Sequence, residues 1–134
     1  MMIEGGCLCG QVRFKGEADP FFQAICHCKN CQKQAGSAFS VVVGLPKEPL
    51  HLTGELANYA DTAESGDTVN RRFCPRCGSG IYSETDKRPG MVILKAGALD
   101  DTSWLEPTVH VWTESAMSFT AIPEGVMTFP RNAG

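Results

Sequence analysis

The 134-residue sequence lacks the features of nucleic-acid-binding and membrane proteins. It has no basic run longer than Arg71-Arg72, and its formal net charge is −3. Phosphate backbones are bound by clustered lysines and arginines, so we expect no nucleic-acid partner. No segment approaches the roughly 20 apolar residues of a membrane span, and the opening MMIEGGCLCG lacks the apolar stretch of a signal peptide. We therefore expect a soluble, cytoplasmic protein.

Sustained helical periodicity is also missing, because no stretch keeps an apolar face over three turns. Short runs rich in Val, Ile and Phe recur instead between Gly and Pro residues, as in strands joined by turns. The expected strands are residues 11–15, 38–43, 50–52, 57–59, 81–83, 91–95 and 110–113. One helical turn is expected from Cys28 to Gln34, ended by Gly36. The sequence predicts a single, mostly antiparallel all-β domain over residues 1–134, with few short helical turns.

Cysteine is abundant and clustered, with seven residues in the chain. A reducing compartment disfavours disulfides, and an odd number would leave one thiol unpaired. The spacings C-x-C, C-x-C-x-x-C and C-P-x-C-G are typical of sites for zinc or a similar metal that prefers soft ligands. We therefore expect the cysteines to bind metal.

The first expected metal site has four cysteines. The sequence CPRCG at residues 74–78 is a zinc-knuckle pattern, in which the two-residue gap lets both sulfurs face one ion and the glycine tolerates a positive φ. The N-terminal C-x-C motif supplies the other half of a closed, tetrahedral and therefore structural site. The ligands of this site are Cys7, Cys9, Cys74 and Cys77. Such a site would tie the N-terminus to the middle of the chain.

The second expected site lies in AICHCKNCQKQAG, which places Cys26, Cys28 and Cys31 within six positions. We call these three residues the trio. Three protein ligands with a free fourth position are typical of a catalytic or ligand-binding zinc. In one alternative, Cys26 and Cys28 pair with the knuckle, which would leave Cys31 alone. In another, the trio is a reactive thiol cluster without metal.

A histidine is a further candidate for the fourth position of the trio site. His27 lies between two ligands, where alternation points it away, so His51 and His110 are the better candidates. If the position is open, three thiolates and one Zn²⁺ carry a net charge of about −1, which polarises a bound water less than three neutral histidines do. An incoming thiol suits such a site as well as water does, and binding promotes loss of its proton. The residues therefore favour thiol chemistry over hydrolysis.

Five segments together resemble the glutathione-dependent formaldehyde-activating enzyme family, which also includes the centromere protein V domain. They are GGCLCGQVRF, CHCKNCQKQAGSAFSV, RRFCPRCGSGIY, AGALDD and PTVHVWTESAMSFTAIPEGVMTFP. The resemblance implies a zinc-pinned β-tent fold, a structural zinc on the four-cysteine site and a catalytic zinc on the trio. It also implies condensation of glutathione with formaldehyde to S-(hydroxymethyl)glutathione. Ala116 and Phe119 stand where the family often has a lysine and a tryptophan, a departure that bears on the substrate rather than the fold.

Our leading functional hypothesis is a carbon-sulfur lyase or synthase that adds a glutathione-type thiolate to formaldehyde or a related small aldehyde. It would hold two zinc ions per chain and use glutathione or another low-molecular-weight thiol as co-substrate. Because glutathione carries two carboxylates and one ammonium, we expect cationic and amide groups around it. The candidate contacts are Lys29, Gln32, Lys33, Gln34, Arg71 and Arg72, with Ser37 and Ser40 as further donors. The alternatives are a zinc-stapled module that binds a thiol adduct or protein partner without turnover, and a structural interaction domain.

Overall fold

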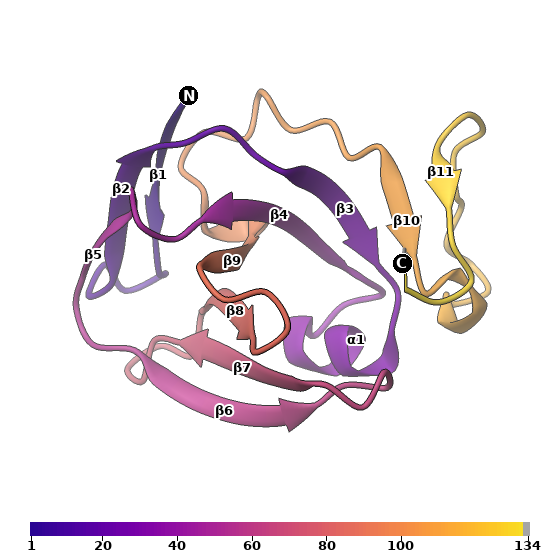
Figure 1. Ribbon diagram of the computed structural model, residues 1–134, viewed down its shortest axis with the longest axis horizontal. Helices are drawn as coiled ribbons and strands as arrows, with labels where there is room; N and C mark the ends of the chain where they lie inside the picture. The colour runs from indigo at the N-terminus through magenta and orange to yellow at the C-terminus, as the bar shows by residue number, and fades with distance from the viewer. Residues whose placement is uncertain (133–134) are drawn as a thin grey trace.

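The computed structural model describes residues 1–132, so the end of the expected domain at residue 134 lies outside the described residues. The chain forms two β-sheets (Figure 1). The smaller sheet is antiparallel, in the order β1-β2-β5. Its strands are β1 (Met2–Gly6), β2 (Arg13–Glu17) and β5 (His51–Thr53).

The larger sheet has the strand order β11-β10-β3-β4-β9-β8-β7-β6. Its strands are β3 (Phe22–Cys26), β4 (Ser40–Pro46), β6 (Ala57–Thr62), β7 (Thr68–Phe73), β8 (Gly80–Thr85), β9 (Met91–Lys95), β10 (Val109–Val111) and β11 (Met127–Thr128). The sheet curves strongly, and the single α-helix of the described residues lies between β4 on one side and β6 and β7 on the other (Figure 1). Two 3₁₀ turns complete the structure, η1 (Ala96–Ala98) and η2 (Thr113–Ser115).

The prediction of a mostly antiparallel all-β fold is confirmed. The strand expected at residues 91–95 coincides with β9, and the other expected strands overlap β2, β4, β5, β6, β8 and β10. The strands β1, β3, β7 and β11 were not predicted: β1 and β7 carry few apolar residues, β11 has only two residues, and β3 (FQAIC) runs into the cysteine motif of the trio. The structure adds two parallel pairings, of β10 with β3 and with β11.

The helix α1 (Lys29–Ala35) confirms the predicted helical turn. Its N-cap is Cys28, whose Sγ accepts a hydrogen bond from the backbone N–H of Cys31 at 3.2 Å. Gly36 ends the helix with a φ of 63°, a left-handed conformation that glycine adopts without strain. The described residues contain no helix that is long and apolar enough to cross a membrane.

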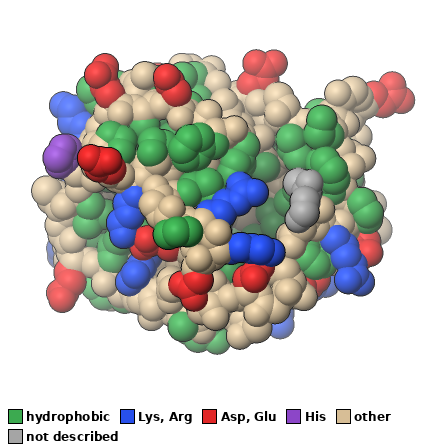
Figure 2. Space-filling model, viewed as in Figure 1, with side chains coloured by type: hydrophobic (Ala, Val, Ile, Leu, Met, Phe, Trp, Pro, Cys, Tyr) green, Lys and Arg blue, Asp and Glu red, His purple; other side chains and the backbone are tan. Residues whose placement is uncertain are grey.

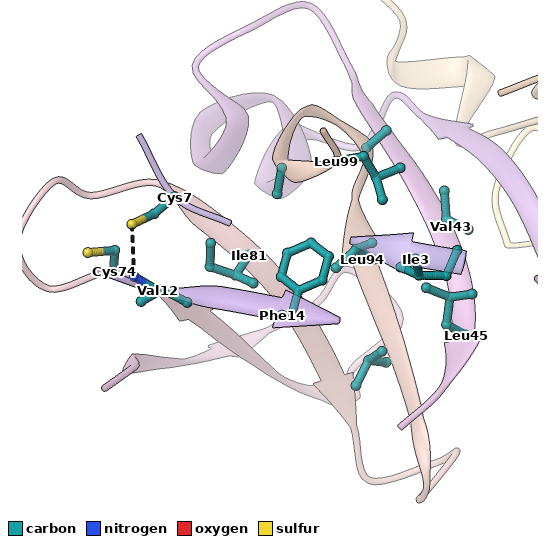
Figure 3. Packing of buried hydrophobic residues seen from close by; sticks show 13 residues of the cluster. Ile3, Cys7, Val12, Phe14, Val43, Leu45, Cys74, Ile81, Leu94 and Leu99 are labelled. Atoms are coloured by element: carbon teal, nitrogen blue, oxygen red, sulfur yellow. Dashed lines mark hydrogen bonds between the residues drawn. The ribbon is translucent and has the colours of Figure 1, made fainter. Parts of the chain in front are cut away.

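The hydrophobic core is formed by residues of both sheets (Figure 3). Ile3 and Phe14 of the small sheet pack with Val43, Leu45 and Leu94 of the large sheet, and all five side chains are buried. Burying each such side chain stabilises the fold by roughly 1.5–3 kcal/mol. Figure 3 shows two cysteines at one end of this cluster, so the core continues directly into a sulfur-rich region.

Candidate metal centres and thiol site

The four-cysteine site brings together two turns that are far apart in the sequence. Its sulfur atoms, from Cys7, Cys9, Cys74 and Cys77, lie within 4.8 Å of one another. The Sγ atoms of Cys7 and Cys9 are 3.6 Å apart, and those of Cys9 and Cys74 are 3.8 Å apart. A tetrahedron with zinc–sulfur distances of about 2.3 Å has edges of about 3.8 Å. The residues therefore fit a tetrahedral zinc ion.

Backbone and hydroxyl donors surround these sulfurs. The N–H of Val12 donates to Cys7 Sγ at 3.2 Å, and the hydroxyl of Ser79 lies 3.2 Å from Cys77 Sγ. The Ser79 hydroxyl is the main reason that the pKa of Cys77 is lowered to about 5. The N–H of Gly78 bonds Cys74 O at 2.8 Å, and Gly78 has a φ of 81°. The knuckle is thus held in a shape that favours thiolates facing one point.

The trio lies at the junction of β3 and α1. Cys26 ends β3, Cys28 caps the helix and Cys31 belongs to its first turn. Their three sulfurs lie within 4.8 Å of one another, and no histidine, carboxylate or further cysteine of residues 1–132 joins the group. The structure therefore brings three protein donors together and supplies no fourth from the described residues.

The three histidines lie outside the trio cluster. His27 is fully buried, and its Nε2 lies 2.9 Å from Nδ1 of the buried His110. Burial is the largest cause that lowers the pKa of both rings. His51 is exposed on β5 of the small sheet. Neither of the two histidines expected as the better ligands, His51 and His110, belongs to the trio cluster.

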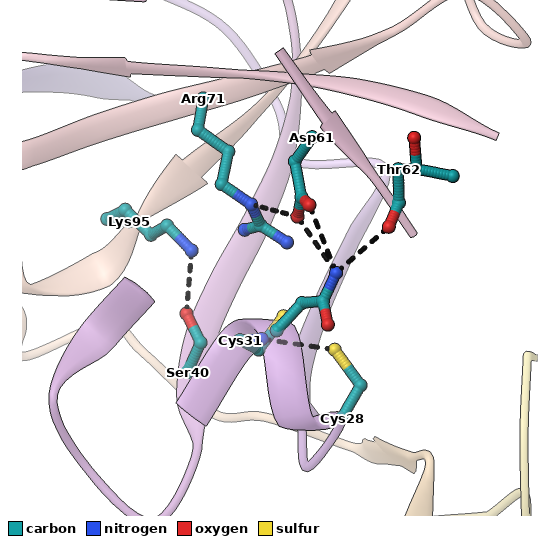
Figure 4. A network of polar contacts seen from close by, with 8 residues as sticks. Cys28, Cys31, Ser40, Asp61, Thr62, Arg71 and Lys95 are labelled. Carbon is teal, nitrogen blue, oxygen red and sulfur yellow. Dashed lines mark hydrogen bonds and ion pairs between the residues drawn. The ribbon is translucent and has the colours of Figure 1, made fainter. Parts of the chain in front are cut away.

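Two cations accompany the trio (Figure 4). Hydrogen bonds from Cys26 and then Cys28 are the largest effects that lower the pKa of Cys31 to about 2. The positive charges of Lys95 and Arg71 act in the same direction. Three thiolates with one divalent zinc carry a net charge of about −1, so neighbouring cations match that donor set. The trio therefore also fits a zinc ion.

Arg71 is held by a carboxylate. The side chain of Arg71 is buried in β7, and its Nε donates to Asp61 Oδ2 of β6 at 2.9 Å. Asn30 of α1 donates to both carboxylate oxygens of Asp61, at 3.2 and 3.0 Å, and to the carbonyl of Thr62 (Figure 4). This network joins the helix of the trio to the edge of the large sheet and fixes the guanidinium beside Cys31.

A cavity of about 480 Å³ opens beside this network, between α1, β6, β7 and the knuckle. Its lining combines two cations, two amides, two aromatic rings, a carboxylate and a glycine. These residues are Lys33, Arg71, Asn30, Gln34, Tyr59, Phe73, Asp61 and Gly78. Basic side chains gather beside a hollow near α1 on the face shown in Figure 2. The volume and the mixed lining suit a small polar molecule with an apolar stem.

Half of the six residues expected to contact a thiol line the cavity: Lys33, Gln34 and Arg71. The other three have partners within the protein. Lys29 Nζ lies 3.4 Å from Gln32 Oε1, and the buried Gln32 amide donates to the carbonyls of His27 and Ser115. Arg72 lies 3.4 Å from Glu84.

The sequence prediction missed Lys95, Asp61 and Asn30. Asn30 lies inside the motif of the trio, and its position between two metal-ligand candidates was the only signal in the sequence. Lys95 ends a predicted strand and Asp61 follows one, but nothing in the sequence shows that either strand passes the trio. Phe119, which stands where the resembled family often has a tryptophan, is 77% exposed.

Comparison with known proteins relates the whole arrangement to one family. The family model described as "Glutathione-dependent formaldehyde-activating enzyme" matches residues 2–115. A relative from Talaromyces marneffei is 27% identical over 112 residues, which cover 81% of this chain and 59% of the relative. A relative from Podospora anserina is 28% identical, and the match covers 69% of this chain and 44% of the relative. A relative from Halomonas elongata is also 28% identical, and the match covers 91% of this chain and 82% of the relative. All three carry the name "Putative glutathione-dependent formaldehyde-activating enzyme".

A solved structure supports the fold. The crystal structure of a Rhodobacter sphaeroides protein superimposes with a TM-score of 0.58 at 19% identity, covering 78% of this chain and 91% of that protein. The chain spans about half the length of the first two relatives, which are longer proteins. Since the family model covers most of the sequence and both cysteine clusters, the chain belongs to the glutathione-dependent formaldehyde-activating enzyme family.

Proposed function

We propose that this protein adds a low-molecular-weight thiol of the glutathione type to formaldehyde or a related small aldehyde, as a carbon-sulfur lyase acting in the synthetic direction. The observation that carries the proposal is the trio, whose three sulfurs converge without a fourth protein ligand from the described residues. An open position beside a cavity is what a site needs to admit a substrate. The family and the names of the relatives supply the thiol and the aldehyde.

The two clusters would hold two zinc ions with different roles. The four-cysteine site is a closed set of donors at the end of the core, which suits a structural ion. Cys26, Cys28 and Cys31 would hold the second zinc, which would act as a Lewis acid and lower the pKa of an incoming thiol. The seven cysteines are all free thiols in the structure, so we also place the protein in a reducing compartment, the cytoplasm.

The chain's own residues would bind and orient the thiol. The tail of a glutathione-type thiol carries carboxylates, and Lys33 and Arg71 offer cations to them from two sides of the cavity. Gln34 lines the cavity and its buried Oε1 has no hydrogen-bond partner, so a turn of this amide toward the cavity would let it accept from an N–H of the ligand. Tyr59 and Phe73 provide apolar surface for the stem. Because Asp61 fixes the Arg71 guanidinium, this cation is oriented before the thiol arrives.

A rate measurement tests the proposal. Thiols add to formaldehyde without a catalyst, so product formation alone does not distinguish an enzyme from a binding module. Exchange between free and added glutathione, followed by NMR, should be faster with zinc-loaded protein than with the same concentration of free zinc. An exchange rate that the protein leaves unchanged would reject the enzyme and leave a binding module. In a cobalt-substituted protein, glutathione should perturb the spectrum of one of the two sites, and an unperturbed spectrum would reject the open position.

A further inference from the structure

Lys95 shares one face of the large sheet with the trio. Cys26 at the end of β3 lies opposite Ser40 of β4, and Val42 of β4 lies opposite Lys95 of β9. Partners across antiparallel strands project to the same face, as do residues two apart on one strand. The register therefore gathers the side chains of Cys26, Ser40 and Lys95. Figure 4 shows Ser40 and Lys95 near the helical turn of Cys31.

The ammonium of Lys95 has donors to spare. Its Nζ donates to Ser40 Oγ at 3.0 Å, and no ion pair of residues 1–132 includes it. An ammonium has three N–H donors, so two remain for other groups. Burial lowers the pKa of Lys95, and the negative charge of Cys31 opposes this shift. The negative charge of the trio offsets part of the cost of burying this cation, and the two remaining N–H donors are available to an oxygen that gains negative charge.

The stem of Lys95 also lies near the cavity. A Cβ placed on Gly80 of β8 would lie 3.7 Å from Lys95 Cγ and 2.8 Å from Gln34 Nε2. The Lys95 stem and the Gln34 amide therefore approach the same glycine, and Gln34 lines the cavity while Lys95 lies behind that lining. Lys95 thus shares a face of the sheet with the trio, and its stem lies close to Gln34, one of the residues proposed to hold the thiol.

We propose that Lys95 is a catalytic residue that donates a hydrogen bond to the aldehyde oxygen as the thiol adds, an inference that rests on the proposed function. In this step the thiol sulfur forms a bond to the carbonyl carbon, and the π electrons of the C=O bond move onto oxygen. The thiol has given its proton to water, and the resulting alkoxide takes one from water, so atoms and charge balance. A fixed cationic donor stabilises the developing alkoxide more than the neutral carbonyl, which lowers the barrier.

A second role for Lys95, neutralising the sulfurs of the trio, makes a different prediction. Neutralisation depends only on the charge of Lys95 and not on where its N–H groups point, so it is lost in Lys95→Met but kept in Ser40→Ala. A hydrogen bond to the substrate oxygen affects only ligands that carry a negative oxygen where the alkoxide forms. Two glutathione derivatives of the same shape report on the hydrogen bond: S-carboxymethylglutathione places carboxylate oxygens one bond beyond the position of the alkoxide oxygen, and S-carbamoylmethylglutathione places a neutral amide there.

The experiment is calorimetric titration of both derivatives into zinc-loaded protein. Wild type and the control Lys15→Met, which removes an exposed lysine of β2, should bind the carboxymethyl derivative about tenfold more tightly than the amide, because hydrogen bonds between charged groups are stronger. In Lys95→Met the ratio should fall toward one, and in Lys95→Arg it should be largely retained. The rate of thiol addition should fall about 10²–10³-fold in Lys95→Met, the loss typical of one removed oxyanion donor.

Ser40→Ala provides a second test, because it removes the group that positions the ammonium and leaves the charge in place. The preference for the carboxymethyl derivative should fall at least twofold while two zinc ions remain bound. If Lys95→Met keeps the preference for the carboxymethyl derivative, the proposed role of Lys95 is wrong. If Lys95→Met does not fold, an unchanged preference in Ser40→Ala would overturn the role instead. A wild type that binds glutathione and both derivatives equally well would overturn it too. If wild type binds none of the three, the proposed function itself fails.

Discussion

Replacing Asp61 with asparagine tests how much the fold depends on one buried ion pair. The carboxylate is 2.9 Å from Arg71 Nε, and the two side chains are only 16% and 7% exposed. Removing one partner of a buried pair costs about 3–5 kcal/mol, because the remaining charge loses its compensation. Asparagine keeps the shape and one acceptor oxygen, so we expect Asp61→Asn to lower the free energy of unfolding by about 3 kcal/mol.

Urea unfolding of the zinc-loaded protein measures this loss. The midpoint should fall while the slope with denaturant stays constant, because the surface exposed on unfolding is unchanged. Zinc content, measured in parallel, separates loss of the ion pair from loss of metal. The matched control is Glu114→Gln, since Glu114 Oε1 also lies 2.9 Å from an arginine Nε, that of Arg131, but these side chains are 43% and 71% exposed. Exposed pairs contribute about 0–1 kcal/mol.

The difference in stability loss between the two variants shows whether burial sets the strength of the ion pair. Equal losses in Asp61→Asn and Glu114→Gln would show that burial does not set the strength of the Arg71 pair. A large loss in Asp61→Asn accompanied by zinc release would mean that the network acts mainly through the trio. Only a selective loss with both zinc ions retained agrees with a buried ion pair that stabilises the fold directly.

Three further predictions concern the metal sites and pH. Cys74→Ser should lower the melting temperature sharply and reduce zinc content, because Cys74 is fully buried and structural zinc sites supply on the order of 10 kcal/mol of folding free energy; an unchanged melting temperature would remove the structural role. Cys28→Ser should abolish glutathione binding in calorimetry with only a modest loss of stability, and normal glutathione binding would return the trio to a structural role. Unfolding free energy should fall as the pH drops below about 6.5, since the unfolded chain binds protons that the buried His110 resists. This dependence on pH should be weaker in His110→Gln and unchanged in the exposed control His51→Gln; the opposite order would contradict the role of burial.

The sequence predicted the cysteine clusters because the spacing of the cysteines within short motifs carries the signal. The two-residue gap of the knuckle and the spacing of the trio limit where the sulfurs can point, and Gly36 marks the end of the helix on its own. Neighbours in sequence were harder to distinguish. Arg71 and Arg72 were treated alike, but β7 alternates, so one side chain turns to the trio and the other to Glu84.

The position of Lys95 beside the trio could not be predicted, because it depends on the register between strands that are distant in sequence. Lys95 reaches Ser40 only because β9 pairs with β4 at one alignment, and a shift of one residue would turn it to the opposite face. The parallel pairing of β10 with β3 is non-local in the same way, and it places Val111 beside Cys26. Single-sequence patterns carry no information about such pairings.

The two cysteine clusters differ in how much chain they enclose. The trio spans six residues, whereas Cys9 and Cys74 are separated by 65 positions. Closing the longer loop in an unfolded chain costs about 2 kcal/mol more in conformational free energy. A metal ion can therefore be captured by the trio in a chain that has not folded, which reduces the share of its binding free energy that counts toward folding. An ion at the four-cysteine site binds only after the two ends of the core meet, so its binding free energy favours the native state almost entirely. The supply of metal should accordingly govern stability through the four-cysteine site and reactivity through the trio.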